Sequence, residues 1–287
     1  DKAAAREVLA AGEAGNDLVV IPDHGDAWDF ENDLAAKDVW GYLRRPVARP
    51  VLHERTARVD GPCAELRQVW MHGDSAITQT IRLMAGAEHL EFDTEVEWRE
   101  PAAMLRVRFP VNVRADEARY EIPFGHIRRT TREDTLVARA QLEVAALQWA
   151  DLSEDGGPGV ALYNDGKHGH RIKGHVIDLA LIRSVPHPGA ALIGKGDRDA
   201  GAVVDGKVYT DLGRHVFRYA LRPHGPDVDA PRLCAEARAF NQPPRVSIGR
   251  GKHVACDDIP RLDSPAVEVA AIMPAEDGRG WIWRLVN

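Results

Sequence analysis

One segment of the sequence places acidic side chains on both sides of an indole ring. Asp26, Trp28 and Asp29 lie within four residues of one another. This pattern is typical of sugar binding, because a carboxylate accepts hydrogen bonds from hydroxyl groups while an indole packs against the C–H face of a sugar ring. A solvated acidic loop explains the same residues, so the segment is a candidate binding site and both interpretations stay open.

A second polar segment contains Asn164, Asp165, Lys167 and His168, and it follows a short apolar run at 160–162. It gathers an amide, a carboxylate, an ammonium group and an imidazole where a predicted strand ends. Binding residues are often displayed on loops at such positions. Asn-Asp-Gly is also an ordinary hairpin turn, which is the alternative interpretation.

Other residue patterns offer weaker chemistry. His168, His170 and His175 have a spacing that binds a metal ion when a carboxylate lies nearby, although exposed turn histidines are favoured. His126 or His168 together with Glu121 would supply the acid–base pair of a sugar epimerase. The sequence contains neither a GxSxG nucleophile motif nor a phosphate-binding P-loop, and the residues alone do not identify a self-sufficient active site.

The elements that position these residues are predicted to be strands, because apolar residues recur mainly at every second position. Each run is expected to bury one face and to expose the other, as in a half-solvated antiparallel sheet. Pro110 favours an edge position for its strand. One helix is predicted over 233–240, ending before two prolines, and 3–14 is a short helix or a turn. The predicted strand segments are 77–83, 90–98, 105–113, 160–162, 177–181, 217–221, 267–273 and 281–285.

The pattern as a whole predicts an all-β sandwich with very little helix, in which 190–208 is a long loop. The chain has 287 residues, 44% of them hydrophobic, and a net charge of −7. That charge argues against a nucleic-acid or membrane-surface partner. Cys63, Cys234 and Cys256 form no disulfide or metal pattern, which indicates a reducing, cytoplasmic compartment. The start at Asp1 predicts a cut end, and 1–287 is expected to form a single domain.

Eight segments in one order resemble the C-terminal β-domain of glycoside hydrolase family 38 α-mannosidases. This resemblance extends over nearly the whole chain. His168 stands where the family usually has Tyr, and an imidazole also hydrogen-bonds a sugar hydroxyl. The matching segments are DAWD at 26–29, EWREPAAMLRVRFP at 97–110, YEIPFGHIRR at 120–129, WADLSE at 149–154, GVALYNDGKHG at 159–169, LALIRS at 179–184, DLGRHVFRYALRPH at 211–224 and FNQP at 240–243.

The resemblance implies a retaining, zinc-dependent α-mannosidase whose nucleophile, general acid and zinc ligands lie in a preceding barrel and helical segment. No catalytic residue or metal ligand is expected in this chain, which is predicted to be inactive alone. Its fold is expected to be a large β-supersandwich of the galactose-mutarotase type that packs on the barrel. The residues expected to contribute to the sugar site are Asp26, Trp28, Asp29, Asn164, Asp165, Lys167 and His168.

Two other functions stay open at this point. The chain is alternatively a free-standing carbohydrate-binding module, or a self-contained epimerase on the same fold. The expected partners are an α-mannoside or oligosaccharide and the catalytic domain of the parent protein, with a homo-oligomer left open.

Overall fold

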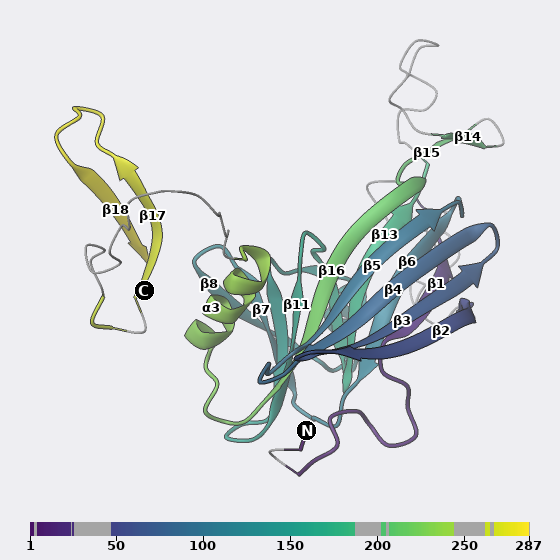
Figure 1. Ribbon diagram of the computed structural model, residues 1–287, viewed down its shortest axis with the longest axis horizontal. Helices are drawn as coiled ribbons and strands as arrows, with labels where there is room; N and C mark the ends of the chain where they lie inside the picture. The colour runs from purple at the N-terminus through teal and green to yellow at the C-terminus, as the bar shows by residue number, and fades with distance from the viewer. Residues whose placement is uncertain are drawn as a thin grey trace.

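In the computed structural model the described residues are 1–2, 5–23, 25, 47–186, 202–204, 207–243, 262–264 and 267–286. They form two large antiparallel sheets and two small hairpins (Figure 1). The nine-stranded sheet has the order β2 (Val51–Asp60), β3 (Cys63–His72), β4 (Ser75–Met84), β5 (Leu90–Trp98), β16 (Gly213–His224), β11 (Gly159–Asn164), β10 (Trp149–Ser153), β7 (Glu117–Ile122), β8 (Gly125–Thr130). The five-stranded sheet has the order β1 (Asp17–Pro22), β6 (Ala103–Pro110), β13 (Val176–Ser184), β12 (Gly169–Lys173), β9 (Val144–Ala145).

The core lies between the two large sheets, where the apolar side chains of alternating positions meet. Phe92 of β5 stacks on Tyr219 of β16, with ring centroids 4.9 Å apart. Phe109 of β6 reaches across from the other sheet, 5.5 Å from the Phe92 ring in an edge-to-face arrangement. All three side chains are buried. The predicted all-β sandwich with very little helix is therefore confirmed, and its period-two pattern identifies the core face.

Strand β6 departs from the predicted half-solvated pattern, because both of its faces are buried. On its outer face Arg106 is 1% exposed, and its Nε donates to Asp178 Oδ1 at 2.5 Å. A second guanidinium nitrogen pairs with Glu143. The edge position predicted from Pro110 is also wrong, since β6 lies between β1 and β13. Pro110 is the last residue of the strand, where the missing N–H leaves the rest of the ladder intact.

Helix α3 (Ala230–Asn241) confirms the predicted helix and packs on the outer face of β10 and β11. Asp229 caps its first turn by accepting from the Arg232 amide at 3.0 Å. Leu233, Ala237 and Phe240 are its buried residues. They contact a cluster that includes Trp149, Ala161, Tyr163 and Ala220.

Several smaller elements complete the described structure. A short helix, α2 (Leu136–Ala140), was not predicted. Part of the loop predicted over 190–208 is instead a hairpin of β14 (Ala202–Val204) and β15 (Lys207–Tyr209). The strands predicted over 267–273 and 281–285 are confirmed as β17 (Glu268–Pro274) and β18 (Trp281–Val286), which pair with each other in a sheet of their own. No helix in the described part of the chain is long and apolar enough to span a membrane, and the described part of 3–14 contains no helix.

Candidate functional site

The turn that follows β11 is built around a buried amide. Asn164 is fully buried, and its Oδ1 accepts from the Lys167 amide at 3.0 Å. Its Nδ2 donates to the Leu147 carbonyl at 3.1 Å and lies 3.1 Å from His170 Nε2. Because these partners use both ends of the carboxamide, Asn164 fixes the shape of the turn and is not displayed to solvent.

The side chains of the turn that do face outward are those of Asp165, Lys167 and His168. His168 is exposed, and its Nδ1 lies 3.2 Å and 3.1 Å from the carbonyl oxygens of Ala146 and Leu147. A carbonyl only accepts, so Nδ1 is the donor in these contacts, and Nε2 has no hydrogen-bond partner among the described residues. Nε2 is therefore the ring nitrogen that remains for a hydrogen bond to a ligand.

Lys167 lines a cavity of about 140 Å³ together with Arg183, Asp211 and His215. Its ammonium nitrogen lies 4.7 Å from the centroid of the Phe217 ring. Burial lowers the pKa of Lys167, while the charge of Asp211 partly offsets this effect. The imidazole of His215 donates from Nε2 to the Asp211 carbonyl at 2.8 Å. The cavity thus presents two cationic side chains and one carboxylate beside the turn.

An ion pair connects this cavity to the end of β1. Arg183 Nε donates to Asp23 Oδ2 at 2.7 Å, and Asp23 is fully buried. The other carboxylate oxygen of Asp23 accepts from the Gly25 amide at 3.1 Å. The chain therefore leaves β1 close to Arg183, immediately before the acidic segment. Asp26, Trp28 and Asp29 themselves lie outside the described residues.

A second cavity, of about 270 Å³, lies on the other side of the turn. Asp165 lines it together with Arg218 and Phe217, below a row of β4 and β5 side chains. Asp165 Oδ2 accepts from Arg218 Nε at 3.1 Å. The Phe217 ring lines this cavity and also lies beneath the Lys167 ammonium group. The turn consequently carries a carboxylate on one side and an ammonium group on the other.

The structure also places the two other groups of residues that the sequence offered, the histidine cluster and the Glu121–His126 pair. His168, His170 and His175 do not converge: His170 is buried against Asn164, and His175 Nε2 lies 2.8 Å from Glu13 Oε1. The described residues hold no group of three or more His, Cys, Asp or Glu side chains placed to bind a metal ion.

Glu121 and His126 do meet, as opposite residues of the β7–β8 hairpin. Burial raises the pKa of Glu121 and lowers the pKa of His126. Glu121 Oε2 accepts from the Gln148 amide at 2.6 Å. Among the described residues, neither Glu121 nor His126 lines one of the five cavities.

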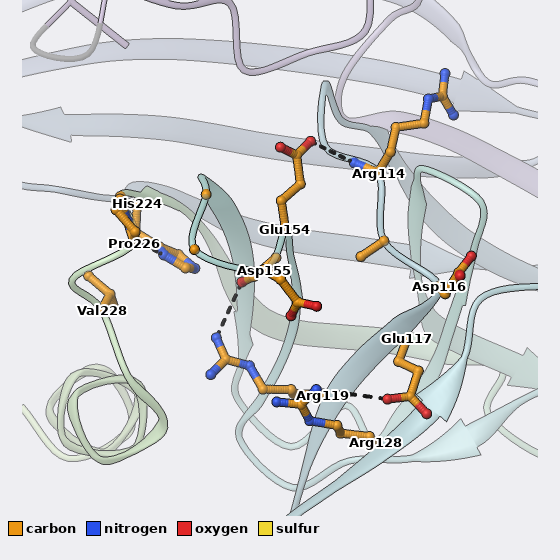
Figure 2. Close-up of a pocket in the computed structure, with 15 residues that line it drawn as sticks. Arg114, Asp116, Glu117, Arg119, Arg128, Glu154, Asp155, His224, Pro226 and Val228 are labelled. Atoms are coloured by element: carbon orange, nitrogen blue, oxygen red, sulfur yellow. Dashed lines mark hydrogen bonds and ion pairs between the residues drawn. The ribbon is translucent and has the colours of Figure 1, made fainter.

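At the opposite end of β11 lies a polar cavity of about 470 Å³ that was not predicted from the sequence (Figure 2). Its floor is a buried network in which Asp151 Oδ1 lies 2.8 Å from His224 Nε2. Asp151 Oδ2 accepts from Arg119 Nη2 at 2.6 Å and from the Ser153 hydroxyl at 2.6 Å. Burial alone would raise the pKa of Asp151, but the hydrogen bond from His224 and the charge of Arg119 outweigh it and lower that pKa.

Most of the missed residues lie in segments that the sequence singled out for their resemblance, although Asp23 and Arg119 lie outside them. Arg183 lies within 179–184, and Asp211 and His215 lie within 211–224. Asp151 and Ser153 lie within 149–154, two positions apart on one strand face. Motif membership was therefore the available signal, but it did not indicate which residues share a cavity.

A family model and the curated relatives both relate this chain to α-mannosidases of glycosyl hydrolase family 38. The family described as "Glycosyl hydrolases family 38 C-terminal domain" matches residues 1–191. Alpha-mannosidase 2C1 of Homo sapiens is 36% identical over 227 residues, which cover 77% of this chain and 19% of that protein. Alpha-mannosidase G of Dictyostelium discoideum is 30% identical over 302 residues, covering 99% of this chain and 25% of that protein. The chain thus spans at most about a quarter of the length of these relatives.

The fold has a solved counterpart as well. The crystal structure of an alpha-mannosidase from Enterococcus faecalis V583 matches with a TM-score of 0.69 and 14% identity, covering 97% of this chain and 33% of that chain. At that identity the match concerns the fold alone. Nearly the whole of the present chain therefore corresponds to one third of a larger protein in three dimensions.

Proposed function

Since this chain belongs to glycosyl hydrolase family 38, as its C-terminal domain, we propose that it is the β-domain of an α-mannosidase that hydrolyses terminal α-mannosides. The proposal rests most directly on the relatives, which are α-mannosidases and are about four to five times longer than the aligned part. The reaction would take place in another part of the parent protein, against which this domain packs. A single domain over 1–287 and a reducing, cytoplasmic location stay predictions.

The contribution proposed for this chain is to bind hydroxyl groups of the sugar from the turn after β11. His168 would accept through Nε2, and Lys167 would donate from a cavity edge that its packing on Phe217 keeps in place. Asp165 would accept on the far side of the turn. Charged side chains suit this role, because hydrogen bonds to an ionised group are stronger than those between neutral groups.

The chemistry itself requires groups that this chain does not provide. A retaining mechanism needs two carboxyl groups on opposite faces of the glycosidic bond, and family 38 enzymes are expected to add a zinc ion in the catalytic domain. Positioning a sugar next to such groups lowers the entropic cost of reaching the transition state. The turn would thus affect how the substrate is held without taking part in bond cleavage.

The test is a kinetic comparison of variants in the full-length parent enzyme. Lys167→Met and His168→Phe each remove one polar contact while keeping the bulk of the side chain. We expect kcat/KM for an α-linked mannobiose to fall about tenfold, the equivalent of about 1.4 kcal/mol. His53→Phe, on the exposed strand β2, is the matched control. Unchanged kcat/KM in both turn variants, with native stability, would refute the contribution of the turn.

A second measurement distinguishes this proposal from the alternative of a free-standing carbohydrate-binding module. Titration of the isolated chain with mannose would quench Trp28 if that residue packs on a sugar ring. The mannosidase proposal further predicts that the pure isolated chain does not hydrolyse aryl α-mannosides. Measurable turnover by that chain would overturn this expectation and favour a self-contained enzyme.

A further inference from the structure

The 470 Å³ cavity lies at the end of β11 that is opposite the Asn164–His168 turn, about 17 Å away along a six-residue strand. Its volume falls within the range of small-molecule sites. The cavity walls come from the β7–β8 hairpin with the residues just before it, the turn between β10 and β11, and the chain that follows β16 (Figure 2). Three segments far apart in sequence therefore converge on one concave surface, and the turn at Asn164–His168 has no part in it.

The floor of the cavity is fixed by groups that are already paired. His224 Nδ1 lies 2.9 Å from the Gly225 carbonyl and Nε2 lies 2.8 Å from Asp151. The Gly225 carbonyl and the Asp151 carboxylate are both acceptors, so the ring is held between two fixed groups of the protein. Gly159 lets the ring approach, because a Cβ on Gly159 would lie 2.3 Å from His224 Cε1. The floor is thus held in place by hydrogen bonds and an ion pair within the protein.

The walls carry both signs of charge in nearly equal number. Three arginines and four acidic residues line the cavity. Arg128 lies 3.8 Å from Glu117 in an exposed pair, and Asp155 forms no ion pair or hydrogen bond with the described residues. Such a lining has little net charge to attract an ion of either sign, and it offers many donors and acceptors to a neutral ligand. The full set of charged wall residues is Arg114, Arg119, Arg128, Asp116, Glu117, Glu154 and Asp155.

One wall of the cavity is apolar and adds an aliphatic surface to the polar lining. Pro226 and Val228 line the side next to His224 (Figure 2). A pyranose ring presents hydroxyl groups around its rim and C–H groups on its faces, so it uses a polar rim and an aliphatic wall together. A phosphate or a simple carboxylate would have no use for that wall.

We propose that this cavity is a second saccharide-binding site, which takes one or two neutral pyranose units of a glycan. Asp155 and Arg128 are the side chains that contact the hydroxyl groups, because neither is tightly paired within the protein. Arg119 and His224 position the floor through Asp151. Sugar binding in this cavity is independent of sugar binding at the Asn164–His168 turn, and the two are tested separately.

The test is a titration of the isotope-labelled chain with methyl α-mannoside and with an α-linked mannobiose, followed by amide chemical shifts. We expect saturable shifts at Gly156, Gly157 and Gly225, with a Kd of about 1–10 mM. Asp155→Ala and Arg128→Ala should each weaken binding about tenfold, since each removes charge-assisted hydrogen bonds. The matched controls are Asp60→Ala and Arg55→Ala on β2, at the other edge of the nine-stranded sheet.

Three results would overturn the proposal. The first is the absence of saturable shifts at the cavity up to about 100 mM of either sugar, far above the expected Kd. The second is a set of shifts confined to the Asn164–His168 turn and unaffected by the two cavity variants. The third is a cavity that responds to sulfate but not to sugar, which would make it an anion site. Loss of binding in the Asp155 and Arg128 variants alone, with their thermal stability unchanged, would support it.

Discussion

Replacement of Arg106 by Met tests how the outer face of β6 is held. Arg106 and Asp178 are each 1% exposed, so removal of the guanidinium leaves a carboxylate buried. Burial by itself lowers the pKa of Arg106, but the charges of Asp178 and Glu143 outweigh it and raise that pKa above its ordinary value. The guanidinium therefore stays charged, and its loss is the loss of an ion pair.

The magnitude follows from what remains after the substitution. Breaking a buried ion pair costs about 3–5 kcal/mol. Arg108 still donates to Asp178 Oδ2 at 3.0 Å, and Glu143 is 20% exposed and can be solvated. Both features place Arg106→Met at the lower end, a loss of about 3 kcal/mol in the free energy of unfolding. The control Arg108→Met removes a partner that is 20% exposed, and it should cost only about 1 kcal/mol.

The assay is urea denaturation followed by tryptophan fluorescence, with the free energy extrapolated to water. A double variant, Arg106→Met with Asp178→Asn, removes the stranded charge and should recover part of the loss. If Arg106→Met costs no more than Arg108→Met, the reasoning is refuted. If the double variant is less stable than the single one, the cost comes from packing and not from charge.

Three further predictions concern stability. Burial raises the pKa of Glu121 in the folded state. The folded state therefore loses stability as pH rises above the pKa of the unfolded chain, about 4.3. Glu121→Gln should stabilise the chain at pH 7 but not at pH 3, as measured in thermal melts. For Glu236, burial is outweighed by hydrogen bonds from Arg222 and Tyr163, which lower the pKa to about 2. Glu236→Gln should cost about 1–2 kcal/mol at pH 7, a loss that shrinks as pH falls from about 4.3 to 2 in a pH series of urea titrations. Phe240→Ala should lower the free energy of unfolding by about 3 kcal/mol in urea denaturation, because the ring is 6% exposed and packs against Tyr163. A loss below about 1 kcal/mol would mean that α3 does not unfold cooperatively with the rest of the domain.

Much of the fold was predictable because burial of one face leaves a period of two in the sequence. The helix at α3 was predictable for a similar reason, since Leu233, Ala237 and Phe240 recur at helical spacing and are the buried residues. Strand β6 was misjudged, because Arg106 and Arg108 occupy positions that normally face water. Both arginines pair with Asp178, which lies 72 residues from Arg106 in the sequence. A local sequence pattern cannot predict such a pairing.

The candidate site was only partly predictable. The sequence indicated the turn at Asn164–His168, and the structure shows that Lys167 and Asp165 line cavities there while Asn164 is buried. A turn motif does not distinguish an amide that faces outward from one that faces inward. Arg183 and Asp211 were missed as neighbours of Lys167, since only the pairing of strands from three parts of the chain brings them together.

The position of β16 has a consequence for how the chain folds during synthesis. This strand, Gly213–His224, pairs with β5 on one side and with β11 on the other. It also lies beyond residues 1–191, which the family match covers. Until the ribosome has released it, β5 and β11 both have open edges, and the two halves of the nine-stranded sheet are unconnected. Open strand edges invite pairing with other chains. A fragment cut at residue 191 should therefore aggregate, and a chaperone would be needed mainly in the interval before β16 emerges.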